Sequence, residues 1–426
     1  MLELLDLRDR RERLEPRRLE IDPSVSEAVR GIVERVRAEG DAALVALTRR
    51  FDGVDLSEGG LLVSLDEFER AEQATPPDLR AALDSLIERL TEFHARQLPQ
   101  PWTDVTAGVR FGEIVRPVRS AGCYVPGGRA VYPSSVAMTV VPAVVAGVEE
   151  IVVCSPPRAD GTLPDAVAYA ALKAGATSVV KVGGAQAIAA LAYGVQSVPA
   201  VDRIVGPGNV YVTEAKRQVA GTVGIDGLAG PTELVIVADA SADPALLAVD
   251  LVSQAEHDPD ASTTLVTTDR ALLDSTAPFL ESEVAQAARR EVVEASLAKS
   301  RAVVVLDEDQ AAEVVNDLAP EHLEVLIPNA RAFVEKVRNA GAIFLGEWTA
   351  VPFGDYGVAS NHVLPTAGTA RFASGLRAAD FVTISSVTEM DQSAVERFAP
   401  ETAAIAKAES FAGHARAMEF RAERQP

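Results

Sequence analysis

The stretch SVVKVGGAQAIAALAYG, residues 178–194, decides the fold class. It begins with a short β-branched run, turns at Gly183-Gly184, and continues as an alanine-rich segment with helical spacing. Units of the same form stand on either side of it, at 150–176 (EIVVCS to PDAVAYAALKAGA) and 201–221 (VDRIVG to NVYVTEAKRQVAG). Consecutive strand and helix units need crossover connections, so this part of the chain is predicted to form a parallel sheet covered by helices.

A second series of the same kind follows. Helical stretches separate its strand-like runs, which are ELVIVAD (233–239), STTLVTT (262–268), AVVVLD (302–307), HLEVLIP (322–328) and AIFLGEW (342–348). Two successive series predict an α/β protein with two doubly wound domains and a cleft between them. Residues 26–51 and 77–97 have apolar positions three or four apart and are predicted to be helical, with His94 at the surface. From about residue 376 the strand pattern is predicted to give way to helix.

The composition excludes several classes of protein. At 426 residues the chain is too long for one simple core, and two or three domains are expected. The net charge of −22 argues against partners such as nucleic acid or an anionic membrane, because a surface of this sign would repel both. The longest near-apolar run, residues 136–148, is too short to cross a bilayer, and residues 1–16 lack the apolar core of a signal peptide.

The chain contains two cysteines, Cys123 and Cys154, each in or after a strand-like run. They are too few for a disulfide framework, so we expect buried thiols in a reducing cytosol. A soluble, cytoplasmic protein is therefore predicted.

A polar cluster, SQAEHDPD (253–260), ends an apolar helical run. Pro259 disfavours helix at the residue before it, so the cluster falls on the last helical turn. Gln254 and His257 then share one face, an arrangement that suits a metal or substrate site. A solvated helix end, with His257 favoured by the helix dipole, explains the same residues.

Three glycine-rich turns join a strand to a helix, at 124–128, 182–186 and 206–209. Glycine lets backbone N–H groups approach a phosphate at a helix N-terminus. None of the turns matches GxGxxG or GxxxxGK[ST], and each also fits a plain connection between elements. Together within one subdomain they favour a single ligand-binding edge.

Carboxylates and imidazoles stand in two further turns. Glu321 and His322 follow a proline, and such a pair can divide general acid and base work, although an exposed polar turn fits equally well. Asp355 has glycines on both sides, which permits close approach to a ligand or simply forms a turn. Two histidines, one aspartate and an amide oxygen are donors that Zn²⁺ accepts, although glutamine is an unusual ligand. No HExxH, CxxC or GxSxG motif is present.

Taken together, these motifs resemble the histidinol dehydrogenase family. Nine motifs match in order from about residue 110 to the tail: YVPGG (124–128), GGAQAIAAL (183–191), VDRIVGPGN (201–209), EAKRQVAG (214–221), AGPTE (229–233), SQAEHDPDA (253–261), LAPEHLE (318–324), FGDYG (353–357) and SNHVLPT (360–366). The resemblance implies a zinc-dependent, NAD-dependent four-electron dehydrogenase. Such an enzyme oxidises L-histidinol through an aldehyde to L-histidine, with two NAD⁺, at the end of histidine biosynthesis.

The resemblance also implies roles for single residues. The zinc ligands are Gln254, His257, Asp355 and His414. The catalytic residues are Glu321 and His322, with His322 removing the hydroxyl proton and Glu321 activating water, and the NAD contacts are Tyr124, Gln186 and Asn209. The substrate contacts are Thr232, Gln254, His257, His322, Asp355, Glu409 and His414. Thr232 stands where many members carry serine, and both side chains offer a hydroxyl.

The implied fold has two incomplete Rossmann-like, doubly wound domains with parallel sheets, an N-terminal arm and a helical C-terminal segment. The arm covers residues 1–22, and the first domain, which carries zinc and the catalytic residues, covers 23–123 and 232–376. The NAD-binding domain covers 124–231. The segment 377–426, which contains Glu409 and His414, is expected to be exchanged in a homodimer with a shared active site.

Three other functions compete with this hypothesis. A paralogue could keep the zinc and NAD machinery and oxidise another small alcohol, but Glu409 and His414 favour histidinol. A non-catalytic metal or nucleotide binder would need neither Glu321 nor His322, so the presence of both residues argues against this alternative. A zinc hydrolase is disfavoured because the chain lacks a three-ligand cluster with an adjacent base in one motif.

Overall fold

The structure, a computed structural model, describes residues 2–10, 13–128, 130–358 and 360–424. Its internal contacts divide the chain into two units. The larger consists of Met1–Gln97 and Arg119–Phe381, and the smaller consists of Leu98–Val118 and Val382–Pro426. The fold is mixed α/β with two parallel sheets, both in the larger unit, as the sequence predicts.

A five-stranded parallel sheet has the order β6-β5-β4-β7-β8. Its strands are β4 (Ser120–Tyr124), β5 (Glu150–Cys154), β6 (Ser178–Val180), β7 (Arg203–Val205) and β8 (Gly224–Ile225). The chain moves outward from β4 to β6 and then crosses to the other side of β4 for β7. The strand order therefore reverses between β4 and β7, and ligands of such sheets bind outside the carboxyl ends of the strands at this reversal.

The helices around this sheet include the N-terminal ones. Those that follow its strands are α5 (Pro133–Ala146), α6 (Asp165–Ala174), α7 (Gly184–Tyr193) and α8 (Val210–Val219), and the N-terminal ones are α1 (Pro23–Glu39), α2 (Asp41–Phe51), α3 (Leu65–Ala74) and α4 (Pro77–Ala95). Helix α1 packs against α7 and α8, while α3 and α4 pack against α6 and α5. Buried Val29 and Leu44 share one core with Ile188.

These contacts differ from the predicted domain boundaries. The predicted zinc-carrying domain includes residues 23–123. The helices of this range instead cover the five-stranded sheet, and the range ends inside β4. The helical period identifies the apolar face of a helix but not the surface that covers it.

A six-stranded parallel sheet has the order β1-β11-β10-β9-β12-β13. Its strands are β1 (Glu3–Asp6), β9 (Glu233–Ala238), β10 (Ser262–Thr267), β11 (Arg301–Val304), β12 (His322–Leu326) and β13 (Ala342–Leu345). The predicted N-terminal arm thus contributes an edge strand, β1. The strand order reverses between β9 and β12.

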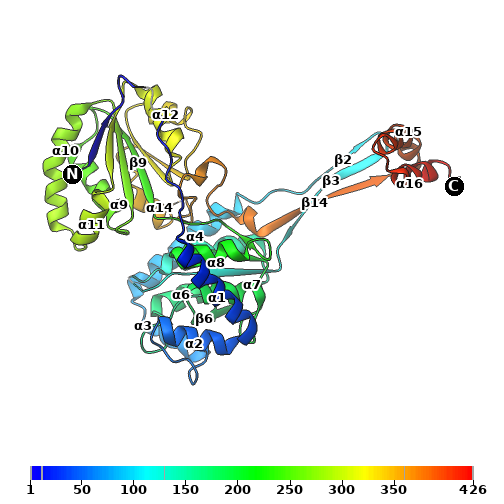
Figure 1. Ribbon diagram of the computed structural model, residues 1–426, viewed down its shortest axis with the longest axis horizontal. Helices are drawn as coiled ribbons and strands as arrows, with labels where there is room; N and C mark the ends of the chain where they lie inside the picture. Colours follow the sequence, from blue (N-terminus) through cyan, green and yellow to red (C-terminus); the bar gives the residue numbers. More distant parts are fainter. Residues whose placement is uncertain (1, 11–12, 129, 359, 425–426) are drawn as a thin grey trace. The chain divides into compact units, whose positions relative to one another are not determined.

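Helices cover both faces of this sheet. They are α9 (Pro244–Ala255), α10 (Arg270–Gln286), α11 (Arg290–Leu297), α12 (Glu308–Leu318), α13 (Ala330–Val334) and α14 (Val351–Asp355), and short 3₁₀ turns follow at η1 (Thr369–Arg371) and η2 (Ala378–Phe381). Alternate residues of β9 divide between two cores: Leu234 packs with α9, and Val235 packs with α12. Figure 1 shows α9 and α12 on opposite sides of β9. Strands buried on both faces are typical of doubly wound sheets.

The smaller unit contains an antiparallel sheet and a helical pair. The sheet has the order β14-β3-β2, with β2 (Trp102–Thr106), β3 (Val109–Pro117) and β14 (Val382–Met390). Ala107 and Gly108, both with positive φ, form the two-residue turn between β2 and β3. Helices α15 (Gln392–Ala408) and α16 (Ala412–Ala422) pack together. The prediction that the tail is helical from about residue 376 was therefore wrong for β14, because every residue of this strand pairs with β3.

Both cysteines are buried and unpaired, as predicted. Burial raises the pKa of the Cys123 thiol to about 12. Within the described ranges, every helix is too short or too polar to cross a membrane.

Candidate active site

An acid–base pair lies where β12 begins. Helix α12 ends at Leu318, Ala319 adopts a left-handed conformation, and the next residue is a proline that cannot continue the helix. Glu321 and His322 follow, 6% and 4% exposed. His322 is the first residue of the strand, so the prediction of a loop holds for Glu321 but not for His322. Oε2 of Glu321 lies 3.6 Å from Nδ1 of His322.

The start of β9 holds the Glu321 carboxylate. Oε2 accepts a 2.5 Å hydrogen bond from the hydroxyl of Thr232 and a 3.0 Å bond from the backbone N–H of Glu233. The register pairs His322 with Leu234, so the amino ends of β9 and β12 lie side by side. The acid–base pair therefore lies at the reversal of strand order, but at the amino edge of the sheet rather than at the usual carboxyl edge.

Asp355, at the end of α14, lies between two imidazoles. Its Oδ1 is 3.6 Å from Nε2 of His322, and its Oδ2 is 3.8 Å from Nε2 of His257. Burial alone would raise the pKa of Asp355, but the neighbouring histidines, His322 first, lower it below its ordinary value. Burial alone would lower the pKa of His322, but Glu321 and Asp355 outweigh it and raise this pKa.

The ring nitrogens of His322 remain available for a ligand. Separations of 3.6 Å are too long for hydrogen bonds. Within the described part of the chain, neither nitrogen has a hydrogen-bond partner, although both are buried. A buried imidazole without partners is unfavourable unless something binds to it, so the ring is suited to meet a polar substrate group.

Gln254 and His257 reach the same place from α9. Gln254 lies in the last helical turn and is 3% exposed, while His257 follows the helix end and its side chain is 46% exposed. Nε2 of Gln254 donates to the Thr232 hydroxyl at 2.9 Å, which leaves the amide oxygen as the donor atom for a metal. Gln254, His257 and Asp355 line one small hollow, although His257 lies beyond the helix and not in its last turn as the sequence predicts.

The donor set of this hollow fits a zinc ion. It offers an imidazole nitrogen, a carboxylate oxygen and an amide oxygen, all of which zinc accepts. Among the residues that the structure describes, no group of three or more His, Cys, Asp or Glu is placed to hold a metal.

The remaining two predicted residues belong to the smaller unit. Glu409 caps the C-terminus of α15, and His414 lies in the first turn of α16. The larger unit alone therefore brings together three of the four predicted ligands, both catalytic residues and Thr232.

One histidine, His362, contacts Asp355 and Ser135 through its two ring nitrogens. Nδ1 of His362 lies 2.8 Å from the backbone oxygen of Asp355, and Nε2 lies 3.1 Å from the Ser135 hydroxyl. Burial lowers the pKa of His362. No role for His362 was predicted, although the motif SNHVLPT that contains it was the available signal.

His94 was predicted at the surface, and this was wrong. It is fully buried and hydrogen-bonds to Gln97 and to the distant Asn361. A contact across that separation cannot be found from the periodicity of one helix.

The predicted NAD contacts gather at the carboxyl edge of the five-stranded sheet. Tyr124 ends β4, Gln186 lies in the first turn of α7, and Asn209 caps α8. The Tyr124 hydroxyl accepts a 3.0 Å bond from the N–H of Gly184, which fixes the glycine turn before α7. Tyr124 and Gln186 are buried, and Asn209 is exposed. The three residues surround the reversal between β4 and β7, where a nucleotide is expected.

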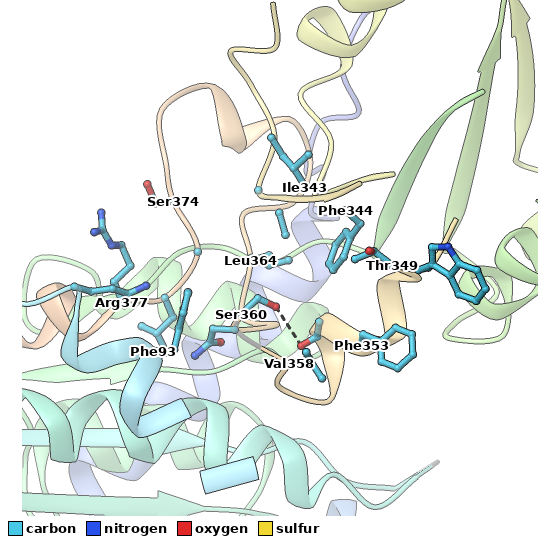
Figure 2. A pocket seen from close by; sticks show the side chains of 18 residues that line it. Phe93, Ile343, Phe344, Thr349, Phe353, Val358, Ser360, Leu364, Ser374 and Arg377 are labelled. Carbon is cyan, nitrogen blue, oxygen red and sulfur yellow. Dashed lines mark hydrogen bonds between the residues drawn. The ribbon is translucent and has the colours of Figure 1, made fainter. Parts of the chain in front are cut away.

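A cavity of about 620 Å³ is lined in part by Phe353, Gly354, Val358, Ser360 and Asn361, which are close in sequence to Asp355. Figure 2 shows its mainly apolar lining, including Phe93, Phe344 and Leu364. None of the predicted catalytic, metal or cofactor residues lines it. The cavity is therefore separate from the predicted catalytic, metal and cofactor residues.

Known proteins resemble this chain over almost its full length. The family model described as histidinol dehydrogenase matches residues 15–422. The chain is 47% identical over 398 residues to a histidinol dehydrogenase of Halalkalibacterium halodurans, covering 93% of each chain. It is 45% identical over 425 residues to one of Moorella thermoacetica, covering 99% of this chain and 100% of the relative.

A solved structure is similar to this chain in fold and sequence. The crystal structure of histidinol dehydrogenase from Elizabethkingia anophelis superposes with a TM-score of 0.93 at 32% identity, covering 99% of this chain and 98% of that one. A match over almost the full length, in sequence and in fold, shows that the chain belongs to the histidinol dehydrogenase family.

Proposed function

We propose that this protein oxidises L-histidinol through L-histidinal to L-histidine, using two NAD⁺, in histidine biosynthesis. The observation that carries the proposal is a cluster in which buried Glu321 and His322 lie against half-buried Thr232 and Asp355, next to Gln254 and His257, in a chain of this family. Tyr124, Gln186 and Asn209 would hold NAD⁺, which would supply the hydride acceptor for each oxidation. Gln254, His257, Asp355 and His414 would hold zinc, which would supply a charge that orients the nitrogen atoms of the substrate.

His322 is the general base for the hydroxyl proton in this proposal. Its ring nitrogens are buried and have no hydrogen-bond partner among the residues that the structure describes, and the carboxylates of Glu321 and Asp355 stabilise the protonated ring. A raised pKa makes the imidazole a stronger proton acceptor. The contact with Asp355 orients the ring, in the way that carboxylates orient catalytic imidazoles.

Glu321 activates the water that hydrates the aldehyde. One oxygen, Oε2, is already used by Thr232 and by the N–H of Glu233. The other oxygen can take a proton from water while these two bonds fix the carboxylate. Thr232 also contacts the substrate in this scheme, together with Glu409 and the four zinc ligands.

The proposed site is completed by a second copy of the chain. Glu409 and His414 belong to the smaller unit, which has its own sheet and helical pair. We assign these two residues to the active site of the partner subunit, so a homodimer with shared sites is the active form. Two buried, unpaired cysteines support a location in the reducing cytoplasm.

The test is the stoichiometry of NADH formation. Purified protein is given limiting L-histidinol and excess NAD⁺, before and after removal of metal with a chelator and after re-addition of zinc. Two NADH per histidinol, lost on chelation and restored by zinc, are expected. A zinc-loaded protein that forms no NADH from histidinol would contradict the proposal and direct attention to other small amino alcohols.

A further inference from the structure

A buried ion pair lies beneath the glycine turn 206–209. Lys216 of α8 pairs with Asp226, which directly follows β8, and their side chains are 3% and 8% exposed. Removing two charges from water is unfavourable unless their remaining hydrogen-bonding capacity is also used. Here that capacity is used by backbone groups of Gly206 and Gly227.

The pair binds both backbone polar groups of Gly206. Nζ of Lys216 donates to the Gly206 carbonyl at 3.0 Å, and the Gly206 N–H donates to Oδ2 of Asp226 at 2.7 Å. Gly206 has a φ of +114°, and a Cβ atom at this position would lie 2.1 Å from the Tyr124 carbonyl oxygen. The residue is therefore confined between the end of β4 and the two charged groups.

The other end of the turn is fixed as well. The Asn209 side chain accepts hydrogen bonds from the N–H groups of Tyr211 and Val212, at 3.0 and 3.2 Å, and so caps α8. The same helix carries Lys216. The turn, the helix and Asp226 thus form one rigid assembly at the reversal of strand order between β4 and β7.

Asp226 also begins the segment that leads to the acid–base cluster. Its Oδ1 accepts a 2.7 Å bond from the Gly227 N–H. Farther along, the Ala229 carbonyl accepts a 2.9 Å bond from the hydroxyl of Thr213 in α8. Thr232, which bonds to Glu321, lies at the end of this segment. The carboxylate of Asp226 is therefore shared between the turn and the connection to the catalytic strands.

We propose that Lys216 and Asp226 are a positioning pair for the cofactor: they fix the turn 206–209, which contacts NAD⁺, relative to the segment that carries Thr232. The inference rests on the proposed function, because that function makes the turn a cofactor site. Neither side chain touches histidinol or zinc in this assignment. Loss of the pair should therefore affect NAD⁺ much more than histidinol.

The test is the double variant Lys216→Met/Asp226→Asn, which leaves the net charge unchanged and no buried charge unpaired. We expect KM for NAD⁺ to rise at least about tenfold, because small displacements of a positioning element have large effects. KM for histidinol should stay within about twofold of wild type. Calorimetric titration of the metal-loaded protein with NAD⁺ alone should show the same loss of affinity.

A second ion pair on α8 provides the matched control. Arg217 pairs with the fully buried carboxylate of Glu214, and among the described residues neither side chain hydrogen-bonds to the turn 206–209. Glu214→Gln/Arg217→Met removes the same two charges and should leave both KM values near wild type. The inference is overturned if the Lys216/Asp226 variant binds NAD⁺ like wild type, or if the control loses NAD⁺ affinity equally.

The wild-type titration separates this inference from the proposed function. A wild-type protein that binds NAD⁺ but does not oxidise histidinol contradicts the proposed function alone, and the titrations of the variants still decide the inference. A wild-type protein that does not bind NAD⁺ overturns both.

Discussion

The hydroxyl of Thr232 donates a 2.5 Å hydrogen bond to Oε2 of Glu321. The same hydroxyl oxygen accepts a bond from Nε2 of Gln254 at 2.9 Å. One small side chain thus joins the proposed water-activating carboxylate to a proposed zinc ligand. The bond to Gln254 fixes which amide atom is left for a metal, and the bond to Glu321 fixes which carboxylate oxygen is left for water.

Thr232→Val should therefore impair both functions, because it keeps the shape and removes the hydroxyl. We expect kcat to fall by about 10- to 100-fold. The affinity for zinc should fall by a similar factor, because Thr232 is hydrogen-bonded to a proposed zinc ligand. Steady-state kinetics and metal analysis after dialysis measure the two effects. Thr232→Ser keeps the hydroxyl and should resemble wild type, and a serine variant as impaired as the valine variant would show that the hydrogen bonds are not the reason.

Glu321→Gln should separate the two oxidations. The amide can still accept the bond from Thr232, but it cannot take a proton from water, so oxidation of added L-histidinal should slow by about 10²- to 10⁴-fold. Single-turnover formation of NADH from each substrate gives the two rates. Aldehyde oxidation at the wild-type rate would rule out the role assigned to Glu321. Glu347→Gln, on the connection after β13, is the control and should leave both rates unchanged.

Mixed dimers should recover activity if the smaller unit is exchanged. Glu321→Gln and His414→Ala are each expected to lose almost all steady-state conversion of L-histidinol to L-histidine, but a mixed dimer has one site with both native residues. Random pairing should restore about a quarter of the wild-type activity. NADH formation by the co-refolded mixture measures this.

The control mixture combines Glu321→Gln with His322→Ala, both in the larger unit, and should remain inactive. No recovery in the first mixture, with dimers present by sedimentation, would place His414 in the site of its own chain or outside the site.

The sequence predicted the strands whose hydrophobic pattern reflects their burial in the fold. The strands of both parallel sheets are buried on two faces, so their Val and Ile runs stand out, and the glycine turns mark where they end. Every residue of β2 is exposed, and β14 is exposed except at its first residue, so neither shows the alternation that marks a strand.

The candidate site was predictable to a similar degree. The end of α9 and the Pro-Glu-His step each suggested polar chemistry, and the structure brings them together through Thr232 and Asp355. The hydrogen bonds of Thr232 join residues that are distant in the chain, and periodicity carries no information about such contacts. The burial of His94 depends in the same way on Asn361.

A buried carboxyl pair should make the stability of this protein depend on pH. Burial, with Asp250 nearby, raises the pKa of Glu324 from 4.5 to about 9, and Oε2 of Glu324 has no hydrogen-bond partner among the described residues. Between these two pH values the folded chain keeps a proton that the unfolded chain has lost, so the free energy of unfolding falls as pH rises.

Glu324→Gln cannot ionise and should remove this contribution. Relative to wild type, the variant should gain at least about 1 kcal/mol between about pH 6 and pH 8 in denaturant titrations. Glu389→Gln, at an exposed ion pair of β14, should keep the wild-type slope, and an equal slope in Glu324→Gln would mean that Glu324 is already ionised in the folded protein.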